Sequence, residues 1–321
     1  MAAAPAAAME FSLPLACTPG SDCAVQNYVD RDPGPDAVDF DCGHQTYDGH
    51  DATDPRIRSL KPRGDGVPVL AAAAGTVTAI RDGMPDVSIR ESGAGAVANR
   101  ECGNGVIIDH ADGWTTQYCH MKEGSIRVKV GDRVTAGTPI GEVGLSGATE
   151  FPHVHFEVTH AGKGVDPFAP ATLAGGACTT AGDAAGSLWS ADARSALAYR
   201  PAFVLSAGFA DRAVAIEEAE SGALEDLAVP ANAPALVFWG LAIGLETGDR
   251  QKVEIVAPDG GSFVADEIEP LDRPKAQYFA FAGRKLRDAA WPAGTYTGRY
   301  SVIRDGRTIA TREVPLTIGP P

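Results

Sequence analysis

Hydrophobic residues occur along most of this chain in short runs, separated by turns, in which apolar and polar positions alternate. Between residues 67 and 158 these runs include VPVLAAAAGTVTAI, GNGVIIDH, WTTQYCH and HVHFEVT. Side chains two residues apart project from the same face of a β-strand, so this alternation predicts strands. No internal repeat or heptad pattern appears. The sequence therefore predicts a mostly β fold.

The turn between two of these runs has the signature of a hairpin. Asp112-Gly113 separates residues 106–109 from residues 114–120, and glycine supplies the positive φ that tight hairpin turns require. Residues 11–66 are instead rich in Asp, Gly and Pro and include DRDPGP, which neither a helix nor a central strand tolerates. We expect irregular chain there, and long ordered loops often carry function.

A second group of strand-like runs follows an interruption in the pattern. Residues 179–199 are rich in Ala, Gly, Ser and Thr, as linkers between domains often are. Residues 200–321 then contain AFVLSAG, ALVFWGLAI, KVEIVA and TYTGRYSVI at close spacing. These runs predict a small antiparallel sandwich of the immunoglobulin-like kind. A chain of 321 residues is long enough for two such domains.

The charge of the chain excludes several classes of partner. Its 27 basic and 42 acidic residues give a formal net charge of −15, with no basic cluster. Nucleic acids and anionic membrane surfaces are therefore not expected partners. No apolar span approaches membrane thickness, so no integral membrane segment is expected. The start MAAAPAAAMEF lacks the basic and apolar regions of a signal peptide, and we expect a mature, already processed form.

Six cysteines occur without a Cys-x-x-Cys pair, which favours disulfides over a zinc ribbon. Cys102 and Cys119 flank the predicted hairpin, so we expect them to be bonded. For the other four cysteines we expect Cys23 with Cys42, and Cys17 with Cys178. Disulfides imply an oxidising compartment.

The histidine pattern points to a metal site. His153 and His155 are two apart on a predicted strand, so both rings project from one face. A catalytic zinc ion takes about three protein ligands and keeps an open position for water. A His-x3-Asp pair occurs twice upstream, as His50 with Asp54 and as His44 with Asp48, and spacing does not choose between them. His110 and His160 are expected at the surface.

Three segments together resemble the LytM or lysostaphin-type endopeptidases. They are GHDATD at 49–54, TTQYCHM at 115–121 and GLSGATEFPHVHFEV at 144–158, and the resemblance spans residues 43–168. It implies an antiparallel β-sheet groove with few helices. Carried over by position, the zinc ligands are His50, Asp54 and His155, and the non-ligand catalytic histidines are His120 and His153.

The resemblance also selects between the two upstream pairs. The family's motif ends in Thr-Asp, which matches Thr53-Asp54, so His50 and Asp54 are preferred and His44 is expected to be structural or near the rim. Two departures concern the local loop: Ala52 stands where the family usually has Gly, and Pro55-Arg56 replaces apolar residues.

With the resemblance, the domain organisation becomes more specific. We expect an irregular, disulfide-pinned segment over 1–42, a zinc metallopeptidase domain over 43–178, a linker over 179–199 and an accessory β-sandwich over 200–321.

The resemblance implies a secreted or periplasmic zinc endopeptidase that hydrolyses peptide bonds in bacterial peptidoglycan with a zinc-activated water. Either His120 or His153 is expected to act as the general base. Glu157 lies on the same strand face and either orients a histidine or is solvated. The aromatic residues Trp114, Tyr118 and Phe151 are expected mainly in the core, with groove lining as the alternative.

The alternative function is a catalytically silent regulator of the same fold that binds and activates a wall amidase. Degenerate members of this kind lack one or more ligands, whereas all five positions are retained here. The sandwich is expected to position the enzyme or to bind a protein partner, and an adhesion module is the least favoured interpretation. The bond that is cleaved and the oligomeric state are left open.

Overall fold

A computed structural model describes residues 9–61, 66–170, 186–225 and 227–319. The chain divides into two compact units, of which the first comprises residues 1–56 and 65–198 and the second residues 57–64 and 199–321. Most of the predicted linker lies outside the described residues. Its described part contains the short helix α2 (Ala191–Ala196), which Ser190 caps.

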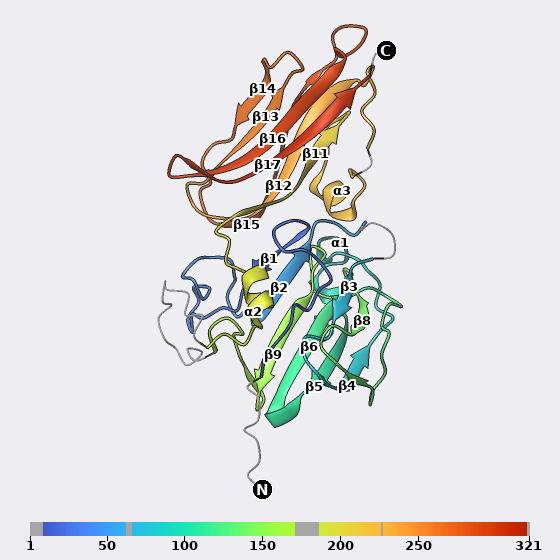
Figure 1. Ribbon diagram of the computed structural model, residues 1–321, viewed down its shortest axis with the longest axis vertical. Helices are drawn as coiled ribbons and strands as arrows, with labels where there is room; N and C mark the ends of the chain where they lie inside the picture. The colour runs from blue at the N-terminus through green and yellow to red at the C-terminus, as the bar shows by residue number, and fades with distance from the viewer. Residues whose placement is uncertain (1–8, 62–65, 171–185, 226, 320–321) are drawn as a thin grey trace. The chain divides into compact units, whose positions relative to one another are not determined.

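The first unit is built on an eight-stranded sheet with the order β1-β2-β9-β6-β5-β4-β7, to which β10 adds beside β9 (Figure 1). Its strands are β1 (Cys23–Asn27), β2 (Ala52–Ile57), β4 (Gly75–Arg81), β5 (Asn104–Asp109), β6 (Trp114–Met121), β7 (Arg133–Val134), β9 (His155–His160) and β10 (Lys163–Gly164). A separate pair joins β3 (Pro68–Leu70) to β8 (Pro139–Glu142). The only described helical turns before residue 186 are α1 (Ile89–Ser92), η1 (Ala94–Ala96) and η2 (Ala111–Gly113). The predicted mostly β class is confirmed.

The hairpin at Asp112-Gly113 is also confirmed, because β5 and β6 pair in an antiparallel register across it. Both turn residues have positive φ, 57° at Asp112 and 78° at Gly113. Both residues tolerate this left-handed conformation, because Gly lacks a Cβ and Asp is among the residues that adopt it most readily.

Residues 11–66 are less irregular than predicted, because they contribute β1 and β2 to the main sheet. The sequence of β2, ATDPRI, has no apolar alternation and contains a proline, so no strand signal is visible in it. All six of its residues are nevertheless buried. Tertiary packing on both sides of this strand therefore overrides its local sequence.

One of the three predicted disulfides is confirmed, between Cys102 and Cys119. Cys17 is bonded to Cys23, so the predicted pairs Cys23–Cys42 and Cys17–Cys178 are wrong. A tight turn over residues 18–22 brings Cys17 and Cys23 to a Cα–Cα distance of 6.2 Å, and sequence spacing alone does not reveal such a turn. Cys42 is disulfide-bonded as well, while Cys178 lies outside the described residues.

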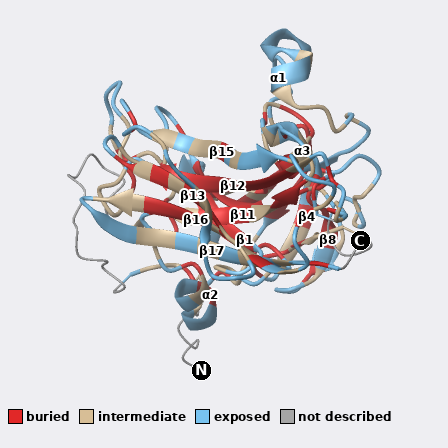
Figure 2. Cartoon of the chain, turned by 90° about the horizontal axis from the view of Figure 1, so that it is seen from above, coloured by how far each residue is buried: buried red, intermediate tan, exposed pale blue. Residues whose placement is uncertain are grey.

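The second unit consists of two sheets with the orders β11-β12-β15 and β14-β13-β16-β17. Their strands are β11 (Phe203–Ala210), β12 (Ala235–Leu245), β13 (Arg250–Val256), β14 (Ser262–Glu267), β15 (Lys275–Lys285), β16 (Gly294–Arg304) and β17 (Arg307–Ile318), with the helix α3 (Ile216–Ser221) after β11. One hydrophobic cluster takes residues from both sheets, and Figure 2 shows the buried stretches along β12, β13 and β16. Two sheets that share a core form a sandwich, and its immunoglobulin-like character stays a prediction.

Two glycines interlock the sheets of this sandwich. A Cβ added to Gly240 of β12 would collide with the ring of Tyr300 on β16, and one added to Gly298 of β16 would collide with the ring of Phe238 on β12. Each aromatic ring thus fills the space left by a glycine on the opposite sheet. Tyr300 and Phe238 are both fully buried.

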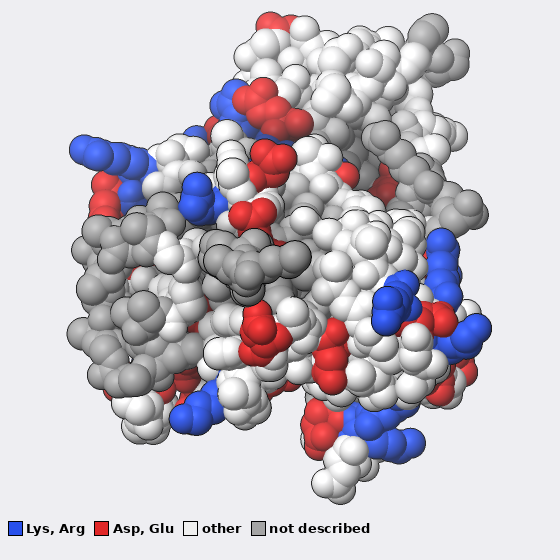
Figure 3. All heavy atoms as spheres, turned by 60° about the horizontal axis from the view of Figure 1, so that its bottom comes forward, with Lys and Arg blue, Asp and Glu red and all other residues white. Residues whose placement is uncertain are grey.

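Charged side chains of both signs are interspersed over the described residues on the face drawn in Figure 3. Among the described helices, none has the length and apolar character needed to span a bilayer.

Gly240→Ala or Gly298→Ala is expected to lower the free energy of unfolding of the sandwich by about 1–3 kcal/mol, because overpacking forces a buried ring out of place. Urea denaturation of each variant measures the change. Gly319→Ala is the control, since an added Cβ there meets nothing within 4 Å. Equal stability of all three variants would contradict the interlocked packing.

Candidate metal centre

Sheet order brings the distant histidine motifs together. Strand β9, which begins at His155, lies between β2, which contains Asp54, and β6, which contains His120. His155 is paired in register with Cys119, the residue before His120. His153 forms a bridge with Arg56, two residues after Asp54. Residues that are about 100 positions apart in sequence therefore converge at one end of three neighbouring strands.

His50, Asp54 and His155 form a compact group of ligand atoms. The Nε2 atom of His50 lies 3.0 Å from Oδ2 of Asp54, and Nδ1 of His155 lies 3.2 Å from Oδ1 of Asp54. The ligand atoms of the three residues lie within 4.8 Å of one another. His50 and Asp54 are almost fully buried, with 3% and 2% of their surface exposed.

The donor atoms of this group fit a metal ion. Nε2 of His50 and Oδ1 of Asp54 are buried, and apart from the close contacts within the group neither has a hydrogen-bond partner among the described residues. Leaving such atoms buried and unmatched is costly unless a cation binds them. Two imidazoles and one carboxylate are also the kind of three-ligand set that catalytic zinc uses, with a position open for water.

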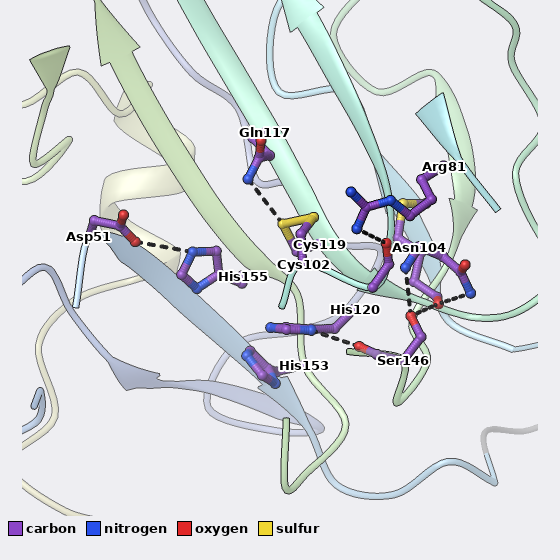
Figure 4. The surroundings of a disulfide bond; sticks show 12 residues. Asp51, Arg81, Cys102, Asn104, Gln117, Cys119, His120, Ser146, His153 and His155 are labelled. Atoms are coloured by element: carbon purple, nitrogen blue, oxygen red, sulfur yellow. Dashed lines mark hydrogen bonds and ion pairs between the residues drawn. A yellow bond between two sulfur atoms is a disulfide. The ribbon is translucent and has the colours of Figure 1, made fainter. Parts of the chain in front are cut away.

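Neighbouring groups orient these ligands. Nδ1 of His50 lies 2.7 Å from the carbonyl oxygen of Tyr28, so this nitrogen carries the proton and Nε2 presents its lone pair to the site. The side-chain amide of Asn27 donates to Oδ2 of Asp54 at 2.9 Å. Asp51 lies 3.2 Å from Nε2 of His155 (Figure 4). Such outer contacts fix ring orientation and ligand basicity.

His120 and His153 stand beside the ligand group, and their ring centroids are 4.8 Å apart. Nδ1 of His120 donates to the carbonyl of Ser146 at 2.8 Å, and Nδ1 of His153 donates to the carbonyl of Phe151 at 2.9 Å. In both rings Nε2 is therefore the nitrogen with a lone pair. Together with His155, these two histidines form a second group of potential ligand atoms within 4.8 Å.

The backbone at His120 has a left-handed conformation, with φ of 62°. Two backbone hydrogen bonds hold it there, from His120 N to Cys102 O at 2.8 Å and from Gly144 N to His120 O at 3.0 Å. Such conformations cost energy in a residue with a side chain and persist where the surroundings impose them. The position of this ring is thus imposed by the fold.

Burial and charge set different protonation states within the cluster. Burial lowers the pKa of His153 to about 4 although Asp54 acts against it, and burial together with His153 and His155 lowers the pKa of His120 well below its usual value. Both rings are therefore neutral near pH 7. Burial acts against the charged form of His155 too, but Asp51 and Asp54 outweigh it and raise the pKa of His155 to about 10.

Asp54 remains ionised despite its burial. Burial alone would raise the pKa of this carboxyl group, but the imidazoles of His50, His153 and His155 hold that pKa well below its usual range. The cluster thus contains one buried negative charge that a proton on His155 or a metal ion neutralises.

The structure thus brings together all five predicted site residues. The competing pair, His44 and Asp48, is exposed and belongs to neither group of candidate ligand atoms in the described part of the chain. His110 and His160 lie outside both groups as well. Glu157 is partly exposed, and burial raises its pKa.

The aromatic residues near the site divide between core and rim. Tyr118 is fully buried, and its hydroxyl accepts from the backbone N–H of Ala72. Trp114 packs edge-on against Phe11 and stacks on His160. Of these three residues, Phe151 lies at the cluster, with its ring centroid 4.7 Å from that of His153.

The departure at Pro55-Arg56 has a structural explanation. Arg56 is fully buried, bonds through Nη1 to Gln26 and lies 4.4 Å from the centroid of the Phe151 ring. The carbonyl of Pro55 accepts from Val154 N at 3.1 Å. This pair therefore attaches the Asp54 strand to the segment that carries both late histidines.

Comparison with known proteins agrees with this geometry. Residues 61–167 match the model of peptidase family M23. This part of the chain is thus similar to the M23 peptidases. The match contains His120, His153 and His155, whereas His50 and Asp54 precede it. The match supports a hydrolase of the metallopeptidase kind and confirms the resemblance to LytM-type proteins.

The M23 relatives include enzymes and activators. The chain is 34% identical over 101 residues to the peptidoglycan DD-endopeptidase ShyA of Vibrio cholerae, a match covering 30% of this chain and 22% of that protein. It is 35% identical over 100 residues to the murein hydrolase activator EnvC of Escherichia coli, a match covering 31% of this chain and 22% of that protein. Among solved structures, the catalytic domain of the M23 protein EnpA of Enterococcus faecalis is 26% identical, with 46% of this chain and 91% of that chain covered and a TM-score of 0.32. The matches span only 15 to 28% of the length of the first curated relatives.

Asn27→Ala is expected to lower zinc affinity about 10- to 100-fold, because Asp54 loses the amide that orients it. Competition with a chromophoric zinc chelator measures the change. Asn232→Ala, at an exposed position of the second unit, is the control. If both variants bind zinc like the unmodified protein, Asn27 has no part in the site.

Proposed function

We propose that this protein is a zinc endopeptidase that hydrolyses peptide bonds in bacterial cell-wall peptidoglycan. The observation that carries the proposal is the buried His50–Asp54–His155 group, with its unmatched donor atoms, directly beside two neutral histidines. A zinc ion held there would supply Lewis-acid activation of a water molecule and of the scissile carbonyl.

Residues of the chain bind the metal and transfer the proton in this proposal. His50, Asp54 and His155 hold the metal. His120 and His153 are kept neutral by burial, and each presents the lone pair of Nε2 because its Nδ1 proton is bound to a backbone carbonyl. A neutral imidazole of this kind can take the proton of the attacking water and, once protonated, return it to the leaving amine.

The wall-peptide substrate is supported by the kind of relatives the M23 part has, among them a peptidoglycan DD-endopeptidase. The disulfides are consistent with a secreted or periplasmic protein, because such bonds persist in oxidising compartments. The sandwich is an accessory domain in this proposal, either placing the peptidase unit on its substrate or binding a protein partner.

The second candidate is an activator of another wall hydrolase, which the similarity to the murein hydrolase activator favours. An activator needs neither stoichiometric zinc nor neutral histidines beside it. The buried and complete set of five residues therefore favours the enzyme.

His155→Ala is expected to remove both bound zinc and cleavage, because a ligand is lost. His153→Ala is expected to keep zinc but to lower kcat about 10²- to 10⁴-fold, the usual contribution of a general acid–base group. Metal analysis and release of peptides from purified peptidoglycan measure the two effects. His160→Ala, an exposed histidine outside the cluster, is the control.

Two results would refute parts of this proposal. Stoichiometric zinc without peptide release in the unmodified protein would favour the activator. A purified protein that does not take up zinc would remove the metal site and with it the enzyme.

A further inference from the structure

A cavity of about 400 Å³ lies beside the metal centre, between the segment 81–100 and Gly147. Its size is in the range of small-ligand pockets. The apolar part of its lining comes from Met84, Pro85, Val87 and Val97, and two guanidinium groups, those of Arg81 and Arg100, line it as well.

One loop separates this cavity from the two neutral histidines. Gly147 lines the cavity, while the residue before it, Ser146, accepts the Nδ1 proton of His120 through its carbonyl. Figure 4 shows Ser146 between His120 and Asn104, with Arg81 on the far side of Asn104. Two residues further on, Thr149 contacts Nδ1 of His153 at 3.2 Å through its hydroxyl. The loop 146–149 therefore contacts the cavity through Gly147 and both neutral histidines through Ser146 and Thr149.

The cavity wall is fixed in place. A Cβ on Gly147 would collide with the carbonyl of Glu101, and Ala148 N donates to that same carbonyl at 2.7 Å. On the other side, Ile89 N donates to the carbonyl of Thr149 at 2.9 Å. Backbone hydrogen bonds thus connect the loop 146–149 both to Ile89 of the segment 81–100 and to Glu101, the residue that follows it.

The two arginines make the cavity suited to an anion. Arg81 donates through Nη1 to the carbonyl of Gly103 at 3.3 Å, and Arg100 donates through Nη2 to the carbonyl of Ala96 at 2.9 Å. Neither guanidinium forms an ion pair within 4 Å with a described residue, although the carboxylate of Glu101 interacts electrostatically with Arg81, so most of their N–H donors are available. The acidic residue of the lining, Asp82, accepts from Gly83 N and Gly124 N through Oδ1.

We propose that this cavity is a substrate subsite for a residue that carries a free carboxylate next to the scissile bond. Arg81 and Arg100 bind the carboxylate, and its aliphatic part packs on Met84, Val87 and Val97. Guanidinium groups bind carboxylates with charge-assisted, often bidentate hydrogen bonds. The chain has a net charge of −15, which disfavours anion binding in general. The two guanidinium groups without ion-pair partners make this cavity a place where an anion is favoured. The inference rests on the proposed endopeptidase function and specifies its substrate.

The test compares matched wall-derived peptides that differ in one group. One pair has a side-chain carboxylate or its amide beside the scissile bond, and a second pair has a chain-terminal carboxylate or its amide, which separates the two sources of the anion. We expect the acid form of one pair to be cleaved with a kcat/KM about 10-fold or more above its amide, as hydrogen bonds to charged groups provide.

The double variant Arg81→Gln/Arg100→Gln is expected to lose this preference while keeping bound zinc. Arg90→Gln is the matched control, because Arg90 belongs to the same segment but pairs with Glu150 and does not line the cavity. It is expected to keep the preference. Arg81→Lys/Arg100→Lys retains both charges and is expected to keep part of it.

The outcomes separate this inference from the proposed function. Equal cleavage of acid and amide peptides overturns the subsite and leaves the endopeptidase intact. If no peptide is cleaved, the endopeptidase fails, and calorimetric binding of the same peptides decides the subsite. Tighter binding of an acid peptide that the double glutamine variant loses supports it, and equal binding overturns it.

Discussion

The buried carboxylate of Asp54 is the constraint around which the first unit is organised. It remains ionised in a protein interior, where an isolated charge is expensive, and it contacts His50 at 3.0 Å, His155 at 3.2 Å and Asn27 at 2.9 Å. These partners come from three adjoining strands or the loops that lead into them. The adjacency of β1, β2 and β9 in the sheet thus places these partners around the carboxylate, and a metal ion bound there would neutralise it.

The amino-terminal segment is part of this arrangement. Asn27 belongs to β1, and the carbonyl of Tyr28 fixes the ring of His50. Both lie upstream of residue 61, where the match to peptidase family M23 begins. The positions of His50 and Asp54 therefore depend on a part of the chain that the family match does not include. The amino-terminal segment is thus a structural part of the candidate site.

The sequence predicted features that depend on residue type and short spacing. The His-x-His pair and the mostly β class were accessible in this way, and the Cys102–Cys119 bond followed from the hairpin between them. The choice of His50 with Asp54 over His44 with Asp48 came instead from the family resemblance. The Tyr28 and Ser146 contacts were not, because backbone carbonyls leave no mark on residue type. Strand β2 was missed because its polar residues are buried by tertiary packing, and Cys17–Cys23 because it depends on a local turn.

The disulfide between Cys102 and Cys119 affects the conditions under which the site around His120 can assemble. Cys119 immediately precedes His120, and the carbonyl of Cys102 accepts the backbone N–H of His120. The strained backbone of that histidine is therefore held by a bond that oxidising surroundings maintain. Reduction of this disulfide would remove the brace, so assembly of the site around His120 depends on redox conditions as well as on folding.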